Sequence, residues 1–281
     1  MIFENRKTVP IWNGAPPMAL GSSDADIPAL TPYFSATGKK NGKVLLILPG
    51  GGYGMLADHE GKDYAEFFAE RGYHCFVLKY RLGKNGYSHP VELSDAARAV
   101  RIIRSSAIES GINPAHIGVI GSSAGGHLAA VLGNIPEDAV YADGEDKGIS
   151  SRPDWSILCY PVITFEEPLT SFWTRKYFCG TENPSQVQID RFSCEKTVSH
   201  KTPPVFIWHN ADDKIVPFEN SLLFASALQK FAVPFELHIY SKGGHGCGLC
   251  DGHPWGLDVI RRMEHIQEWT SDIRKTQGDP L

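Results

Sequence analysis

The segment GSSAG at residues 121–125 is the part of the sequence best suited to covalent chemistry. It matches the pattern G-x-S-x-G, in which a serine lies on a sharp turn between a strand and a helix. Glycine two residues before and two residues after the serine leaves room for that turn. Only Ser123 has glycine at both places, whereas Ser122 falls on the strand side. We therefore predict that Ser123 is a nucleophile that forms a covalent acyl intermediate.

A nucleophilic serine needs a base, and the base needs an orienting carboxylate. In hydrolases with this pattern the acid and then the histidine follow the serine along the chain. His245 lies in SKGGHGCG, directly after the strand-like run PFELHIY, where a glycine-rich loop lets an imidazole reach the serine. His238 lies inside that run, and His253 and His265 come later. The sequence therefore favours His245 as the base.

The acid is expected in HNADDKIVP at residues 209–217, which follows the strand-like run PVFIW. Parallel α/β sheets place their sites at the carboxyl ends of strands, where Asp212 and Asp213 both fall. Because the two residues are adjacent, only one of them can face the imidazole. Spacing alone does not choose between Asp212 and Asp213.

An oxyanion requires backbone N–H donors that are already in place, and a glycine-rich loop can supply them. The run PGGGYG at residues 49–54 follows the first buried strand and is similar to the HGGG-type motif, with proline in place of histidine. One donor would come from Gly51 or Gly52 and the other from Ala124, the residue after the nucleophile. No Lys-Ser or Lys-Thr pair follows the glycines, so the loop does not fit a phosphate cradle.

Alternating strand-like and helix-like runs must position these residues. That alternation predicts βαβ units, a mostly parallel central sheet and helices on both faces, which is an α/β fold. We expect a single domain over residues 1–281, with an extended N-terminal segment at 1–42 and a substrate-binding insertion at 163–203. The expected strands are 43–50, 74–82, 116–121, 154–162, 204–210 and 234–240, and the expected helices are 58–72, 91–111, 124–132, 218–232 and 257–274.

Composition narrows the classes of partner. The chain of 281 residues carries a formal net charge of −5, which argues against a nucleic acid or an anionic membrane as partner. No apolar run approaches the roughly 18 residues of a membrane span, and no signal-like apolar region opens the chain, so we expect a cytoplasmic protein. Cys247 and Cys250 form a CxxC pair without a second pair at zinc-ligand spacing. We therefore expect free thiols, no metal and no cofactor.

Together, five stretches resemble bacterial acetyl esterases and acetylxylan-esterase-like proteins, which are related to the BD-FAE and hormone-sensitive-lipase branches of the α/β-hydrolase superfamily. They are LPGGGYGMLADHEG (48–61), FVLKYRL (76–82), residues 89–129, HNADDKIVP (209–217) and GGHGCGL (243–249). The resemblance implies an α/β-hydrolase fold and a triad of Ser123, Asp213 and His245. Asp213 is preferred because the family pattern places the acid two residues before the segment that matches IVP. The same resemblance implies an oxyanion hole made by Gly51, Gly52 and Ala124.

The resemblance also implies a serine carboxylesterase (EC 3.1.1) that acts on small acyl esters, notably O-acetyl groups on sugars such as xylo-oligosaccharides. Tyr53 and Trp173, with Trp12 and Trp255, are candidates for a wall on which a sugar stacks. The expected partner is a small acyl ester or an acetylated saccharide, and assembly into a homo-oligomer stays open. The alternatives are a general short-chain carboxylesterase or lipase, a serine peptidase-like hydrolase, and a non-catalytic binding protein with a hydrolase fold.

Overall fold

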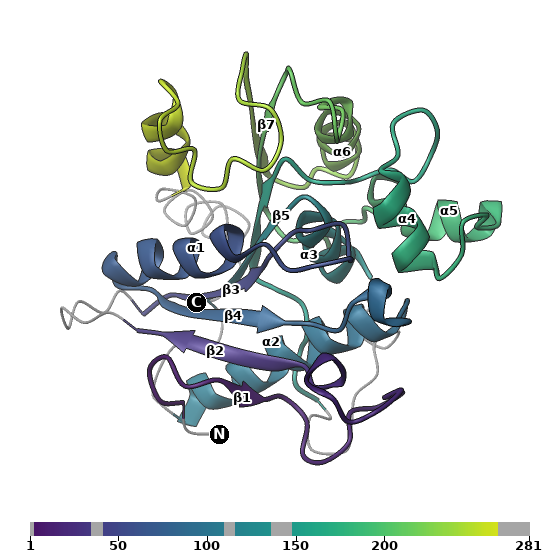
Figure 1. Ribbon diagram of the computed structural model, residues 1–281. Helices are drawn as coiled ribbons and strands as arrows, with labels where there is room; N and C mark the ends of the chain where they lie inside the picture. The colour runs from purple at the N-terminus through teal and green to yellow at the C-terminus, as the bar shows by residue number, and fades with distance from the viewer. Residues whose placement is uncertain (1–2, 35–41, 110–115, 136–147, 264–281) are drawn as a thin grey trace.

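The computed structural model describes residues 3–34, 42–109, 116–135 and 148–263. Within these ranges an eight-stranded sheet has the order β1-β2-β4-β3-β5-β6-β7-β8 (Figure 1). Strand β2 is antiparallel to both β1 and β4, and every neighbouring pair from β4 to β8 is parallel. The mostly parallel sheet predicted from the sequence is thus confirmed. The strands are Val9–Pro10 (β1), Ala29–Tyr33 (β2), Val44–Leu48 (β3), His74–Lys79 (β4), Ile117–Ser122 (β5), Trp155–Cys159 (β6), Val205–Asn210 (β7) and Phe235–Tyr240 (β8).

The central strands are buried on both faces, as continuous apolar runs such as VLLIL in β3 require. All five residues of β3 are buried, and so are all residues of β5, β6 and β7. Alternate side chains of β3 enter two separate cores, because successive residues of a strand point to opposite faces. Leu45 and Ile47 belong to one core, whereas Leu46 and Leu48 belong to the other.

Helices cover both faces of the sheet. The core that contains Leu45 also takes Phe68 from α1 and Val259 from the helical turns at residues 256–263. The core that contains Leu46 takes Val100 from α2, together with residues of α3 and α6. The helices are Asp58–Glu70 (α1), Val91–Glu109 (α2), Ala124–Asn134 (α3), Phe172–Cys179 (α4), Gln186–Phe192 (α5) and Glu219–Lys230 (α6). In the described part of the chain, no helix has the length and apolar character needed to cross a bilayer.

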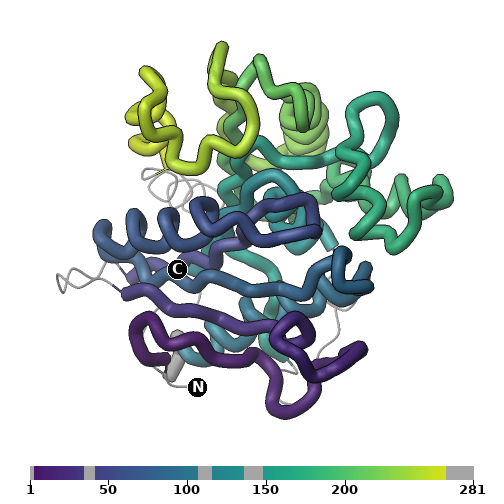
Figure 2. The backbone as a smooth tube through the Cα atoms, viewed as in Figure 1, coloured from purple at the N-terminus to yellow at the C-terminus, as the bar shows by residue number. Residues whose placement is uncertain are grey.

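The predicted elements correspond to observed ones, with ends that shift by a few residues. The N-terminal segment supplies the edge strand β1 and its neighbour β2, and Figure 2 shows these strands at the bottom of the view and the last described residues at the top. The segment 163–203, for which we predicted neither a helix nor a strand, holds α4 and α5. The predicted helix 257–274 is helical up to residue 263, and its remainder lies outside the described residues, as do residues 110 and 111 of the predicted helix 91–111.

A buried ion pair connects the end of β4 to α2 and also binds the N-terminal segment. Arg81, after β4, donates Nε and Nη2 hydrogen bonds to the two carboxylate oxygens of Asp95 on α2, at 2.9 and 2.7 Å. Its third nitrogen donates to the carbonyl of Pro17 (2.7 Å), and the indole of Trp12 donates to Asp95 (3.3 Å). Both charged side chains are fully buried. A two-pronged bond of this kind orients both partners as well as pairing their charges.

Candidate active site

The carboxyl ends of three parallel strands bring the predicted triad together. Ser123 directly follows β5, Asp213 lies three residues after β7, and His245 lies in the loop after β8. Nε2 of His245 is 2.8 Å from Oγ of Ser123, and Nδ1 of the same ring is 2.6 Å from Oδ2 of Asp213. The structure therefore places all three residues in one hydrogen-bonded line at the edge where α/β sheets carry their sites.

Ser123 lies on a strained turn, as the motif predicts. Its φ is 54° and its ψ is −118°, a backbone conformation that side chains larger than glycine rarely adopt. A Cβ atom on Gly121 would lie 2.2 Å from the carbonyl oxygen of Gly125, and a Cβ on Gly125 would lie 2.0 Å from that of Leu48. Both glycines are therefore required for β5 and α3 to meet at so sharp an angle.

The alternative serine and histidines lie elsewhere. Ser122 ends β5, is fully buried, and has its hydroxyl 3.1 Å from the hydroxyl of Tyr64. His238, on β8, stacks on Phe206 of the neighbouring strand β7, and His253 stacks on the ring of Trp255 in its own loop. None of these three side chains hydrogen-bonds to Ser123, and His265 lies outside the described residues.

The carboxylate of Asp213 accepts four N–H groups. Oδ1 takes the amides of Ile215 and Val216, both at 2.9 Å, and Oδ2 takes Nδ1 of His245 and Nε2 of His209, the latter at 3.2 Å. Burial acts to raise the pKa of Asp213. The hydrogen bonds from His209, His245 and Val216 outweigh burial and hold that pKa below its usual value.

The ionised Asp213 sets the tautomer of His245. A carboxylate can only accept hydrogen bonds, so Nδ1 of the imidazole must carry the proton. Nε2 is then left with a lone pair, which faces the hydroxyl of Ser123 at 2.8 Å. This is the arrangement that a general base needs in order to take a proton from a serine.

His209 is a member of the site that the sequence analysis missed. Its Nδ1 is 2.8 Å from the hydroxyl of Ser221, which can donate to it. Nε2 then carries the proton, which is shared between Asp213 and the carbonyl of Val216 at 2.9 Å. His209 is fully buried at the end of β7. Its position four residues before Asp213 is the only signal that the sequence offers. In a strand followed by a turn, that spacing does not determine whether the two side chains meet.

Asp212 has a separate task. Its Oδ1 accepts the amides of Gly243 and Gly244, both at 2.9 Å, and so holds the start of the loop that carries His245. Asn210 donates to the carbonyl of Gly244 at 2.8 Å from the same side. The two adjacent aspartates therefore face in different directions, one toward the imidazole and one toward its loop.

The glycine loop lies directly against the nucleophile. A Cβ atom on Gly50 would lie 2.6 Å from the carbonyl oxygen of Ser122 and 3.0 Å from Cβ of Ser123, so only glycine fits there. Gly51 and Gly52 have φ values of 123° and 64°, which turn the loop sharply. Ala124 is the first residue of α3, so its amide has no acceptor within the helix. The amides of Gly51, Gly52 and Ala124 therefore remain the candidate donors to an oxyanion.

The predicted aromatic wall is largely a set of packed residues. Tyr53 is fully buried, with its hydroxyl 3.0 Å from Nδ1 of His127, so its ring offers no face to a substrate. Trp12 is buried beside Asp95, and Trp255 stacks on Tyr240 with ring centroids 4.3 Å apart. Of these four aromatic residues, Trp173 on α4 is the exposed one, with 55% of its surface accessible.

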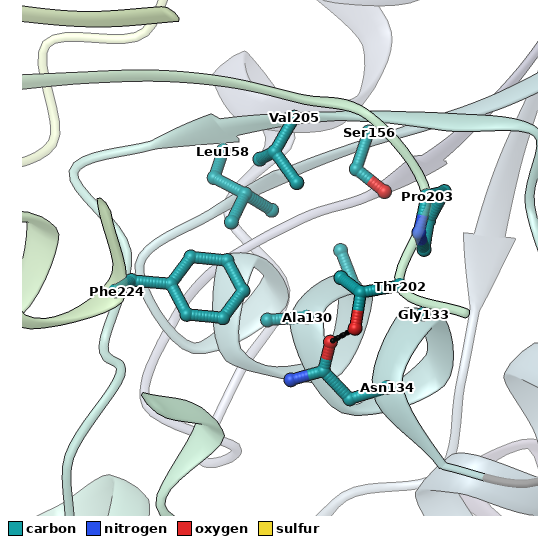
Figure 3. Close-up of a pocket in the computed structure, with 10 residues that line it drawn as sticks. Ala130, Gly133, Asn134, Ser156, Leu158, Thr202, Pro203, Val205 and Phe224 are labelled. Carbon is teal, nitrogen blue, oxygen red and sulfur yellow. Dashed lines mark hydrogen bonds between the residues drawn. The ribbon is translucent and has the colours of Figure 1, made fainter. Parts of the chain in front are cut away.

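The described residues hold no cluster of metal ligands, and the hollow drawn in Figure 3 is separate from the triad. Among the described residues, no three His, Cys, Asp or Glu side chains gather as a metal ion would require. Cys247 and Cys250 are free thiols with their sulfurs 3.7 Å apart. The hollow is lined by residues of α3, β6, β7 and α6, and a hydrogen bond joins Thr202 to Asn134 in its wall (Figure 3). No member of the triad lines it, so it is not where a substrate would meet Ser123.

Comparisons with known proteins agree on the family. The chain is 39% identical over 207 residues to endo-1,4-beta-xylanase B of Butyrivibrio fibrisolvens and 35% identical over 245 residues to an acetylxylan esterase of Xylanibacter ruminicola. These alignments include 72% and 86% of this chain but only 32% and 48% of the relatives, so the chain spans half of their length or less.

A solved structure extends the likeness to nearly the whole chain. The acetyl ester-xyloside bifunctional hydrolase of Caldicellulosiruptor lactoaceticus is 38% identical and superposes with a TM-score of 0.83, covering 96% of this chain and 97% of that one. The BD-FAE family model matches residues 30–228. The chain therefore belongs to the BD-FAE family and has the α/β-hydrolase fold.

Proposed function

We propose that this chain is a serine carboxylesterase that removes acetyl groups from O-acetylated sugars, such as xylo-oligosaccharides, through an acyl-enzyme. The observation that carries the proposal is the imidazole of His245, which bridges Oγ of Ser123 and the carboxylate of Asp213 at 2.8 and 2.6 Å. Ser123 keeps 8% of its surface exposed and the imidazole of His245 keeps 16% of its side chain exposed, so neither side chain is fully sealed from solvent.

The reaction has two halves. In the first half, Nε2 of His245 takes the hydroxyl proton as Oγ of Ser123 attacks the ester carbonyl, and the amides of Gly52 and Ala124 stabilise the oxyanion. The imidazolium, held by Asp213, then gives its proton to the leaving sugar oxygen as the ester bond breaks. In the second half, water attacks the acyl-enzyme, His245 takes the proton of the water, and acetate leaves as Oγ regains a proton.

An aromatic surface beside the glycine loop supports a sugar as the alcohol part of the ester. Trp173 is stacked on Tyr177 with centroids 5.7 Å apart, and Phe172 beside it is 43% exposed. A Cβ atom on Gly52 would lie 3.9 Å from Cβ of Trp173, so this surface borders the proposed oxyanion hole. The C–H face of a pyranose can pack on an exposed indole. Two of the relatives also have names that refer to acetylxylan or xyloside substrates.

The first experiment tests the nucleophile. We expect Ser123→Ala to lower kcat on 4-nitrophenyl acetate by about 10⁴-fold or more, because triad losses are of that size. We also expect a fluorophosphonate probe to label the wild-type chain at Ser123 and to leave the variant unlabelled. Activity of Ser123→Ala within about tenfold of wild type would contradict the assignment. A wild-type chain that forms no adduct would favour a non-catalytic binding protein.

The second experiment tests the substrate. We expect Trp173→Ala to raise KM for acetylated xylo-oligosaccharides about fivefold or more, since an aromatic contact contributes about 1 kcal/mol, while KM for 4-nitrophenyl acetate changes little. Val187→Ala is the matched control, because Val187 is 75% exposed on α5 of the same insertion. A series of 4-nitrophenyl esters from acetate to decanoate should peak at acetate. A maximum at eight carbons or more would instead favour a lipase.

A further inference from the structure

The loop that carries the base has few constraints of its own. We call residues 243–248 the histidine loop and residues 49–54 the oxyanion loop. Gly244, Gly246 and Gly248 all have positive φ values, between 56° and 75°. Glycine loses more conformational freedom on ordering than any other residue, so contacts from outside must hold such a loop in place. The position of His245 therefore depends on the residues that bind the histidine loop from outside it.

Glu60, on the first turn of α1, reaches both loops through its carboxylate. Its Oε2 accepts the amide of Gly50 in the oxyanion loop at 2.8 Å. Its Oε1 accepts the hydroxyl of Tyr160 at 2.7 Å, and that hydroxyl oxygen in turn accepts the amide of Gly248 at 3.0 Å. Glu60 is only 3% exposed. A single buried carboxylate thus joins the donor side of the site to the base side.

Tyr160 is built as a fixed link. It follows β6 with a φ of 38°, which is unusual for a residue other than glycine and marks a backbone that its surroundings hold in place. Its ring meets the imidazole of His245 edge to face, with centroids 5.1 Å apart. Burial, and then the charge of Glu60, raise the pKa of Tyr160 well above its usual value, so the phenol stays protonated and donates a hydrogen bond to Glu60.

Tyr64 holds the other polar group of Gly248. One turn after Glu60 on the same helix, its hydroxyl donates to the carbonyl of Gly248 at 3.1 Å. The hydroxyl of Ser122 lies 3.1 Å from the same phenol and can donate to it. Three residues after the proposed base, the carbonyl of Gly248 is thus bound directly from α1, and its amide is bound by Tyr160, which donates to Glu60 on the same helix.

We propose that Glu60 is a positioning residue, which acts through Tyr160 to hold the histidine loop and the oxyanion loop at a fixed separation. The inference rests on the proposed function, since it takes His245 as base and Gly52 as oxyanion donor. A carboxylate suits this place because both of its oxygens accept hydrogen bonds, whereas a glutamine must turn an NH₂ group toward either Gly50 or Tyr160. Turned toward Gly50, that NH₂ group faces another donor. Turned toward Tyr160, it can donate to the hydroxyl oxygen, but the phenol hydrogen then loses its acceptor, so either orientation breaks one hydrogen bond of the line.

We expect Glu60→Gln to lower kcat on 4-nitrophenyl acetate by about 10- to 100-fold with KM nearly unchanged, because a misplacement of about 1 Å costs on the order of 10²-fold. Tyr160→Phe, which removes one oxygen atom, should lower kcat about tenfold. The double variant should be no worse than Glu60→Gln, because both changes break the same line of hydrogen bonds. Glu70→Gln is the matched control, since Glu70 is exposed at the end of the same helix.

Thermal unfolding measured alongside separates stability from positioning. A kcat within about threefold of wild type in both Glu60→Gln and Tyr160→Phe would overturn the proposal, as would a change confined to KM or losses that multiply in the double variant. Tyr160→Phe carries the test if Glu60→Gln fails to fold. The wild-type chain reports separately on the proposed function: if it neither hydrolyses 4-nitrophenyl acetate nor reacts with a fluorophosphonate, the esterase assignment fails before any variant is compared.

Discussion

Exchange of Asp213 for asparagine tests how the acid sets the base. Oδ1 of the carboxylate faces the amides of Ile215 and Val216, and Oδ2 faces the N–H groups of His209 and His245. An asparagine keeps one accepting oxygen and replaces the other with NH₂, which is a donor only. Whichever way the amide turns, one pair of N–H groups must face another donor.

The orientation that keeps the amides of Ile215 and Val216 satisfied places NH₂ against Nδ1 of His245. The imidazole then moves its proton to Nε2, which points at Ser123 and can no longer act as base. Trapping the wrong tautomer in this way costs about 10⁴-fold in kcat, or about 5.5 kcal/mol at roughly 1.4 kcal/mol for each tenfold change. We therefore expect Asp213→Asn to lower kcat/KM on 4-nitrophenyl acetate by about 10³- to 10⁴-fold.

Asp212→Asn is the matched comparison, because it makes the same chemical change one residue earlier. The carbonyl oxygen of an asparagine can still accept the amides of Gly243 and Gly244, so we expect a loss below about tenfold. Both variants should be compared by steady-state kinetics and by circular dichroism, which checks that each one folds. The reasoning is refuted if Asp213→Asn stays within tenfold of wild type, or if Asp212→Asn is the more damaged of the two.

Three further predictions concern two buried acids that affect stability and the hydrogen bond from His209 to Asp213. Burial raises the pKa of Glu92 to about 8 in the folded chain. Between about pH 4.5 and pH 8, Glu92 is therefore ionised in the unfolded chain but not in the folded one. Over this range the free energy of unfolding of the wild type should fall by up to about 1.4 kcal/mol per pH unit. Urea unfolding at pH 5 and pH 8 should show that Glu92→Gln gains on wild type as the pH rises; an equal gap at both values would count against this. Asp95→Ala should cost about 3–5 kcal/mol in the same assay, because it strands a buried arginine, whereas Glu182→Ala in an exposed ion pair should cost at most about 1 kcal/mol. His209→Phe removes one donor to Asp213 and should lower kcat about tenfold without raising KM; an unchanged kcat would show that His209 serves packing alone.

Features that depend on a few consecutive residues could be predicted from the sequence. The turn at Ser123 is local: a buried strand, two glycines and a small-residue helix lie within about fifteen positions, and each is needed for the geometry. The start of α5, in the segment 163–203, could also have been predicted from a short sequence pattern. Ser185 and Gln188 form a capping box at the start of α5, and S-x-x-Q is a recognised sign of a helix beginning. Helix α4 has no such box, and it ends at Gly180 in the left-handed region.

The choice between Asp212 and Asp213 marks where local reasoning ends. Both residues follow the same strand, and a turn rotates successive side chains by large angles, so their order alone says nothing about which of them faces the imidazole. The decision comes from the amides of Ile215 and Val216, which receive one carboxylate, and from the histidine loop, which receives the other. The amides of Ile215 and Val216 belong to the same turn as Asp213, whereas the amides of Gly243 and Gly244 come within reach of Asp212 only once β7 and β8 have paired.

Glu60 lies further beyond the reach of sequence patterns. It precedes Ser123 by 63 positions and Gly248 by 188, and nothing in the spacing of charged residues along α1 separates it from the exposed acids of the same helix. Its role follows from burial: a carboxylate that has lost contact with water must find donors, and the donors within reach are Gly50 and Tyr160. Removal of a carboxylate from water costs free energy, but it also strengthens the hydrogen bonds that the carboxylate accepts. Strong hydrogen bonds from one carboxylate can therefore hold two glycine-rich loops at a fixed separation.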